Sequence, residues 1–188
     1  MKNYHHGNLK EELISCASDM CERDGYTKLS IRSLAKESNV SQTAPYRHFK
    51  TKEDLYAAVS RHGFNKLSKA IHVDIDKKVT KKQIVDMAIK YIEFGLKSAN
   101  TYDLMMGTAV GNFNNYPELL ESANSVYDNF RSNFSKLAND SDEVIAFKCI
   151  TLWSMVHGLV GILRKVQVVA NEPLMNPDDG PMSSAFLI

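Results

Sequence analysis

The sequence predicts an all-α protein with two domains, and three observations support this prediction. Apolar residues recur every three to four positions along most of the chain, as on the inner face of a helix. No stretch of useful length alternates apolar and polar residues as a half-buried strand does. Residues that favour helix ends, such as Ser30, Thr51 and Gly25, fall between these apolar-periodic segments.

The composition is that of an ordinary soluble globular protein. Of its 188 residues, 44% are hydrophobic and 24% charged, and the net charge is +1. Basic residues outnumber acidic ones in residues 1–70, and the reverse holds in residues 71–188, a modest asymmetry that suits DNA contact at the N-terminal end but does not establish it. The N-terminus is too polar for a signal peptide. The uncharged apolar run at residues 149–163 is shorter than a membrane span.

Several classes of chemistry have no support in the sequence. Three cysteines without CxxC spacing argue against a disulfide scaffold or a zinc site and suit a reducing cytoplasm. The sequence contains no Gly-rich phosphate loop and no HExxH or GxSxG motif. We therefore expect no cofactor, no metal and no enzymatic activity.

The N-terminal domain is expected over residues 1–70. Its first helix follows the N-cap residue Asn8 and ends at Gly25, and its inner stripe contains Leu9, Leu13, Ala17, Met20 and Cys21. A long helix capped by Thr51 and Asp54 then runs to about Ile71 and links the two domains.

Between these helices, residues 30–48 predict a helix-turn-helix. Ser30 caps a short first helix, and Ser38 and Asn39 break it, because Asn tolerates the left-handed backbone of such a turn. The second helix follows the cap residue Ser41 and would lie in the DNA major groove. The residues expected to read base edges are Gln42, Thr43, Ala44 and Pro45. Those expected to contact the DNA backbone are Ser30, Ser41, Tyr46, His48 and Lys52, and Arg47 is also expected to reach toward phosphates.

The second domain is expected over residues 71–188, after a polar boundary at residues 72–82. Helices are predicted from the Thr80–Gln83 capping box, over a short segment that ends at glycines 107 and 111, from Pro117 to Leu137, and from Asp140 to about Val169. The tail after residue 171 is rich in proline and has room for only about two helical turns.

The last long helix is apolar nearly all round from Ile150 to Leu163. A helix without a solvated face must be covered on every side, and a second subunit is the economical cover. We therefore expect a homodimer, with Gly158 and Gly161 allowing close approach. Its interface would contain Val156, Leu159, Val160 and Leu163. The alternative is an ordinary core helix.

Longer motifs resemble one known family. The block VSQTAPYRHFKTKEDLYAAV, residues 40–59, is similar to the DNA-binding signature of TetR/AcrR-type transcriptional regulators, and residues 4–14 and 25–35 also resemble that family. The segment TLWSMVHGLVGIL, residues 151–163, resembles a subgroup marked by Trp, His and Gly, here Trp153, His157 and Gly158. Members usually close their dimer with a further helix, for which the tail of this chain has little room.

The resemblance implies a cytoplasmic repressor that binds a near-palindromic operator as a dimer and is released by a small-molecule effector. Few charges fall within the apolar stripes, which favours an uncharged or amphipathic effector. Its pocket is expected among Tyr91, Phe94, Met105, Phe113, Tyr127, Trp153 and His157. Two alternatives remain: an architectural DNA-binding protein without an effector, and an enzyme that uses His157 as a base.

Overall fold

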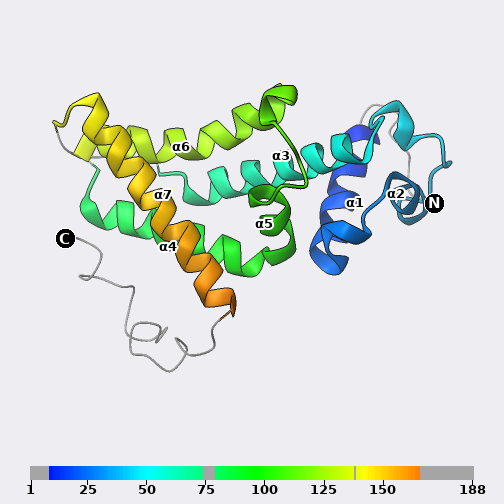
Figure 1. The fold of residues 1–188 in the computed structure, drawn as a ribbon, viewed down its shortest axis with the longest axis horizontal. Helices are drawn as coiled ribbons and strands as arrows, with labels where there is room; N and C mark the ends of the chain where they lie inside the picture. Colours follow the sequence, from blue (N-terminus) through cyan, green and yellow to red (C-terminus); the bar gives the residue numbers. More distant parts are fainter. Residues whose placement is uncertain (1–8, 74–78, 138, 166–188) are drawn as a thin grey trace. The chain divides into compact units, whose positions relative to one another are not determined.

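A computed structural model describes residues 9–73, 79–137 and 139–165, and among these residues it contains helices and no strand. The all-α prediction is confirmed (Figure 1). The α-helices are α1 (Leu9–Asp24), α2 (Ile31–Glu37), α3 (Lys52–Ile71), α4 (Lys81–Lys97), α5 (Ala99–Met106), α6 (Pro117–Leu137) and α7 (Asp142–Lys165). Short 3₁₀ helices are η1 (Tyr26–Lys28), η2 (Pro45–Arg47) and η3 (Phe113–Asn115).

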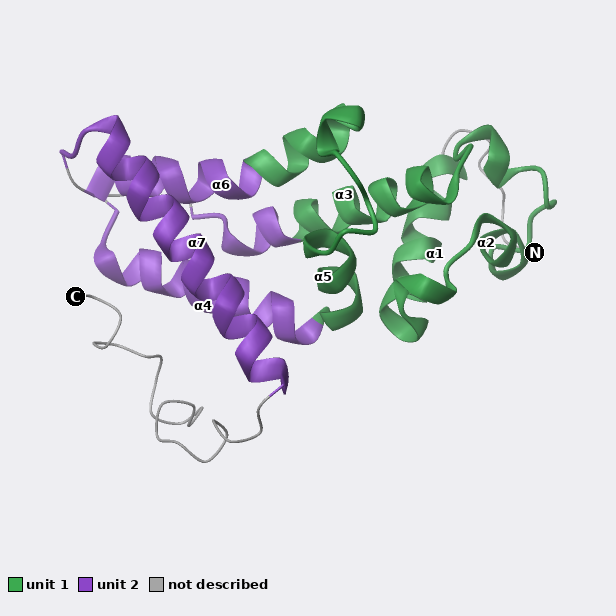
Figure 2. Ribbon diagram, viewed as in Figure 1, with its two compact units in different colours: residues 1–66, 98–124 green, residues 67–97, 125–188 purple. Residues whose placement is uncertain are grey.

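The chain forms two compact units, and neither is continuous in sequence (Figure 2). Unit 1 comprises residues 1–66 and 98–124, and unit 2 comprises residues 67–97 and 125–188. The units therefore do not follow the expected boundary after residue 70, because α5 and the start of α6 cluster with the N-terminal helices. The assignment of DNA binding to residues 1–70 and effector binding to residues 71–188 stays a prediction.

Unit 1 has a core drawn from α1, α2 and α3. Leu13, Leu34 and Leu55 are fully buried, and Phe49 is 1% exposed. Gly25 ends α1 with a left-handed φ of 82°, and its N–H donates to the carbonyl oxygen of Cys21 at 2.9 Å, as the sequence predicts for a helix terminator.

Helix α5 is fixed to α1 through Glu22. Its carboxylate accepts hydrogen bonds from the backbone N–H of Thr101 at 3.0 Å and of Asn100 at 3.4 Å, so it caps the N-terminus of α5. The amide of Asn100 donates back to the carbonyl oxygen of Glu22 at 2.7 Å. In α3, a side chain at Gly63 would collide with Met105 of α5, so glycine permits this close approach.

Unit 2 contains α4 packed against α7 (Figure 1). Tyr91 of α4 is fully buried, and its ring lies 6.4 Å from that of Phe130 in α6. The expected cap of α7 at Asp140 is wrong: the hydroxyl of Ser141 accepts from the N–H of Val144, and Asp140 forms an ion pair with Lys148 at 2.6 Å. The expected extension to Val169 and the segment after residue 171 lie outside the described residues.

Candidate nucleic-acid interface

The turn after α2 has the geometry that the sequence predicts. Ser30 is the N-cap of α2, and its hydroxyl accepts from the N–H of Ser33 at 3.0 Å. Asn39 has a φ of 53°, the only positive φ at a described residue other than glycine. The N–H of Val40 then donates to the carbonyl oxygen of Ala35 at 3.1 Å, which returns the chain toward α2. A tight turn therefore joins α2 to the segment at residues 41–48.

That second segment is not the α-helix that the sequence predicts. Residues 42–44 form a turn, and only Pro45–Arg47 are helical, with 3₁₀ geometry. The N–H of Ala44 donates to the oxygen of Ser41 at 3.0 Å, and that of Arg47 donates to the oxygen of Ala44 at 3.2 Å. Pro45 supplies a physical reason, because an α-helix would need its missing N–H to reach the oxygen of Ser41. The chain makes the shorter bond from Ala44 instead.

Exposure divides the four residues that were expected to read bases. Gln42 and Thr43 are exposed, Ala44 is half-buried, and Pro45 is buried. Burial of Pro45 removes it from the surface that could touch a base edge, which differs from the prediction. The N–H of Phe49 donates to the carbonyl oxygen of Pro45 at 2.9 Å, and the ring of Phe49 is buried in the core. This bond ties Pro45 to a residue that is anchored in the core.

The residues expected at the DNA backbone are exposed, with one exception. Tyr46 is 51% exposed, and Ser41, His48 and Lys52 are also exposed. Ser30 is half-buried, and its hydroxyl is hydrogen-bonded to Ser33 within the capping box. Its side chain therefore stabilises the N-terminus of α2.

Lys52 is the first residue of α3, and two neighbouring residues hold its ammonium group in place. It donates to the carbonyl oxygen of Thr27 at 3.2 Å and lies 5.2 Å from the centre of the Tyr56 ring. The capping box predicted at Thr51 and Asp54 is confirmed, since each residue's backbone N–H donates to the other's side chain, at 2.8 and 3.1 Å.

Arg47, which was expected to reach toward DNA phosphates beside Tyr46 and His48, is the remaining exposed residue of this segment. Arg47 is exposed at the end of η2, and its guanidinium makes no hydrogen bond or ion pair with any described residue. Its guanidinium places a forked cation between Tyr46 and His48.

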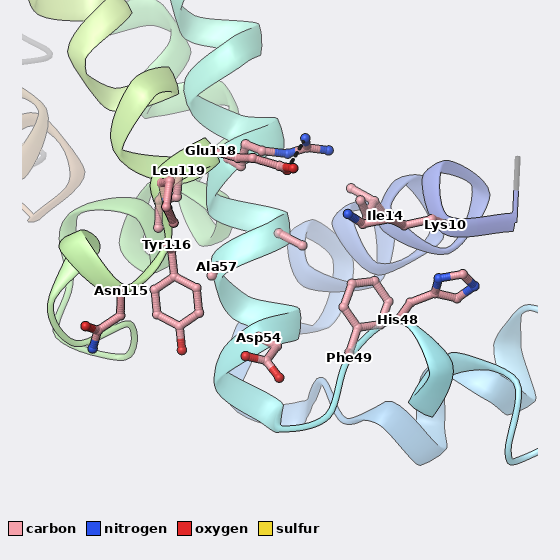
Figure 3. A pocket seen from close by; sticks show the side chains of 13 residues that line it. Lys10, Ile14, His48, Phe49, Asp54, Ala57, Asn115, Tyr116, Glu118 and Leu119 are labelled. Carbon is pink, nitrogen blue, oxygen red and sulfur yellow. Dashed lines mark hydrogen bonds and ion pairs between the residues drawn. The ribbon is translucent and has the colours of Figure 1, made fainter.

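A cleft of about 430 Å³ opens beside this segment, within unit 1 (Figure 3). Its apolar lining includes Ile14, Phe49 and Leu119, and polar groups surround them. The guanidinium of Arg61 in the lining bridges two carboxylates, Glu118 at 2.7 Å and Glu11 at 3.2 Å. Desolvation, followed by the charges of Glu53 and Asp54, raises the pKa of the Tyr116 phenol at its edge.

None of the seven residues expected to line an effector pocket lines this cleft, and two of them, Tyr91 and Trp153, are joined by a hydrogen bond in unit 2. Met105 and Phe113 belong to unit 1, where the ring of Phe113 lies 6.1 Å from that of Phe64. The other five belong to unit 2: Tyr91 is buried, His157 is exposed, and Phe94, Tyr127 and Trp153 are half-buried.

The residues expected at a dimer interface also divide by burial. Val156 and Val160 are 2% and 0% exposed, so they lie inside unit 2 and are not free to contact a second copy, which differs from the prediction. Leu159 and Leu163 are half-buried. The exposed apolar side chains of α7 are instead Val144, Phe147, Ile150, Met155 and Ile162.

Two further features of the described residues concern metal binding and membranes. No group of three or more His, Cys, Asp or Glu side chains is arranged to hold a metal ion among them. Helix α7 is long and apolar enough to cross a membrane by length and composition. A core helix passes the same test, and α7 packs against α4 within unit 2.

Comparison with known proteins identifies a family for the N-terminal region. Residues 13–59 match the model for "Bacterial regulatory proteins, tetR family". An HTH-type transcriptional repressor from Mycobacterium tuberculosis is 28% identical over 116 residues, which are 62% of this chain and 59% of the repressor. The alignment thus spans about three-fifths of that relative.

Two solved structures share the fold. A protein of unknown function from Rhodococcus sp. RHA1 has a TM-score of 0.70 at 23% identity, covering 87% of both chains. BioQ, solved with its double-stranded DNA operator, has a TM-score of 0.58 at 22% identity, covering 84% of this chain and 89% of BioQ. These matches do not test the Trp-His-Gly subgroup, which stays a prediction.

Proposed function

From its TetR-family N-terminal domain, residues 13–59, we infer that this protein is a transcriptional repressor that binds operator DNA as a homodimer in the cytoplasm. The observation that carries the proposal is the segment at residues 42–48, in which five of the seven residues are exposed, presented after a tight turn that Asn39 makes possible. Such a segment projects polar side chains from the surface, as a major-groove reader must. BioQ, a structural neighbour with bound operator, supports the same mode of binding.

Dimerisation is needed because one short segment contacts too few base pairs to select an operator. Two copies would read half-sites separated by about one helical turn, roughly 34–36 Å. The exposed apolar side chains of α7, which include Phe147 at 71% exposed, supply a surface that a second copy would cover. The operator should therefore be near-palindromic.

Release by an effector is the second part of the proposal. An uncharged or amphipathic molecule would bind among the aromatic residues of unit 2 around Tyr91 and Trp153. Binding can release DNA only if the effector has unequal affinity for the DNA-binding and DNA-released states. EbrR, a structural neighbour described as a multidrug binding protein and solved with imidazole, supports the binding of a small molecule.

The deciding experiment selects DNA from a random pool with the full-length protein. We expect an enriched motif with two inverted half-sites, bound by a dimer. Uniform recovery of unrelated sequences would overturn the repressor proposal and favour an architectural DNA-binding protein. For the enzyme alternative, His157 is exposed on α7, and turnover that is lost on His157→Gln would favour it.

A further inference from the structure

Because Pro45 is buried, fewer residues than expected can reach base edges. Of the four residues expected to read bases, only Gln42 and Thr43 are exposed. Thr43 has a single hydroxyl and cannot form a bidentate contact, so Gln42 and Thr43 together can distinguish few base pairs in each half-site. A further reader is therefore needed within the same exposed segment.

The 3₁₀ winding brings Arg47 into position for this role. Side chains three residues apart eclipse one another in a 3₁₀ helix, so Arg47 shares a face with Ala44, as Tyr46 does with Thr43. The bond from the N–H of Arg47 to the oxygen of Ala44, at 3.2 Å, sets this spacing. Ala44 is small, so the long side chain of Arg47 is the one that projects from their shared face.

The other arginines of unit 1 are committed elsewhere or lie on a different element. Arg23 pairs with Asp24 and Glu37, and Arg61 pairs with Glu11 and Glu118. Arg32 lies on α2, the first helix of the motif, which crosses the DNA backbone in this mode of docking. Arg47 alone among them combines an unpaired guanidinium, within the described residues, with a place on the second element.

We propose that Arg47 determines sequence specificity by donating two hydrogen bonds to O6 and N7 of one guanine in each operator half-site. This inference rests on the proposed function. The planar fork of a guanidinium matches the two acceptors on the major-groove edge of guanine, and no other base presents that pair. Lysine keeps the charge but has no fork, so Arg47→Lys separates base reading from attraction to phosphate.

The test uses the operator selected by the wild-type protein and measures affinity for all single base-pair substitutions of each half-site. For the wild type, one guanine position should show a loss of roughly 5- to 150-fold when it is replaced. Both Arg47→Ala and Arg47→Lys should bind every base at that position equally, with other positions unchanged. Lys90→Ala, which removes one exposed charge from α4, is the matched control and should keep the wild-type preference.

A chemical substitution in the DNA gives a second measurement. Replacing that guanine by 7-deazaguanine removes the N7 acceptor, which should weaken the wild type and leave Arg47→Ala unaffected. A uniform loss of affinity at all positions for Arg47→Ala would overturn the proposal by making Arg47 a phosphate contact, while the repressor proposal would stand. If the wild type selects no motif at all, the repressor proposal itself fails.

Discussion

The indole N–H of Trp153 donates to the phenol oxygen of Tyr91 at 3.0 Å, and this bond joins α7 to α4 inside unit 2. Tyr91 is fully buried, while Trp153 is half-buried. Both residues were expected in the effector pocket from sequence. Their hydrogen bond stabilises the packing of α7 on α4. Any effector in this region must therefore bind beside the pair or break this hydrogen bond.

Tyr91→Phe should lower the free energy of unfolding by about 1 kcal/mol, because it removes the acceptor of Trp153 without creating a cavity. Chemical denaturation measures this change, and the fluorescence of Trp153, the only tryptophan, should report an altered environment. Tyr127→Phe is the control, since the half-buried Tyr127 makes no hydrogen bond with a described residue, and it should change stability by less than about 0.5 kcal/mol. Equal effects of the two substitutions would contradict the structural role of the pair.

The left-handed backbone at Asn39 gives a prediction about the turn. Asn39→Val should destabilise the protein by about 1–2 kcal/mol, because a β-branched residue is strained at a φ of 53°. Asn39→Gly at the same position should be neutral within about 0.5 kcal/mol. Thermal unfolding of the two variants measures the difference. If both variants unfold at the same temperature, the left-handed conformation is not required in solution.

The thiols should differ in reactivity. Burial raises the pKa of the Cys21 thiol to about 11 and also raises that of Cys149, while Cys16 is half-buried. Alkylation of the native protein at pH 8, followed by mass spectrometry, should therefore modify Cys16 first. In denaturant the three should react at similar rates. Rapid native labelling of Cys21 would contradict its burial.

The same shift has a consequence for stability. The pKa of Cys21 is higher in the folded state than its ordinary value of 9.0, so its contribution to stability is complete below pH 9. That contribution is lost as the pH rises from 9 toward 11. Unfolding measured across this range should show a steeper loss of stability for the wild type than for Cys21→Ala.

Helix ends were the part of the fold most readily predicted from sequence. The capping residues Ser30, Thr51 and Thr80 all make the expected bonds with residues three positions on. Capping depends on neighbours within one turn, so the sequence contains the whole interaction. Asp140 is an exception: Ser141 caps α7 in its place. The carboxylate of Asp140 instead forms an ion pair with the ammonium of Lys148, eight residues away, at 2.6 Å.

The candidate interface was predicted less completely, for two physical reasons. Pro45 was expected to read bases from an α-helix, but its missing N–H favours 3₁₀ winding over residues 45–47, and it is buried beside the core residue Phe49. Helix α7 is apolar nearly all round, so its periodicity could not separate the buried face at Val156 from the exposed face at Ile150. The bridge from Arg61 to Glu11 and Glu118 joins residues far apart in sequence and has no local signal.

Lys52 provides a test of the expected phosphate contacts. Lys52→Ala should weaken binding to all DNA sequences by a similar factor and flatten the dependence of affinity on salt concentration. The reason is that its ammonium is held beside the N-terminus of α3 by the carbonyl oxygen of Thr27. Binding curves at several salt concentrations, on the selected operator and on unrelated DNA, measure both effects. A loss confined to the operator would instead make Lys52 a base reader.

The two faces of α7 give opposite expectations for the same substitution. Ile150 is 52% exposed, so Ile150→Glu should leave the fold intact and convert dimers into monomers that bind DNA poorly. Val156 is 2% exposed, so Val156→Glu should bury an unpaired charge and lower the unfolding temperature strongly. Sedimentation measures the first effect and thermal unfolding the second. Dimers of Ile150→Glu with wild-type DNA affinity would exclude this face from the interface, because a charge buried between two copies cannot be tolerated without loss of association.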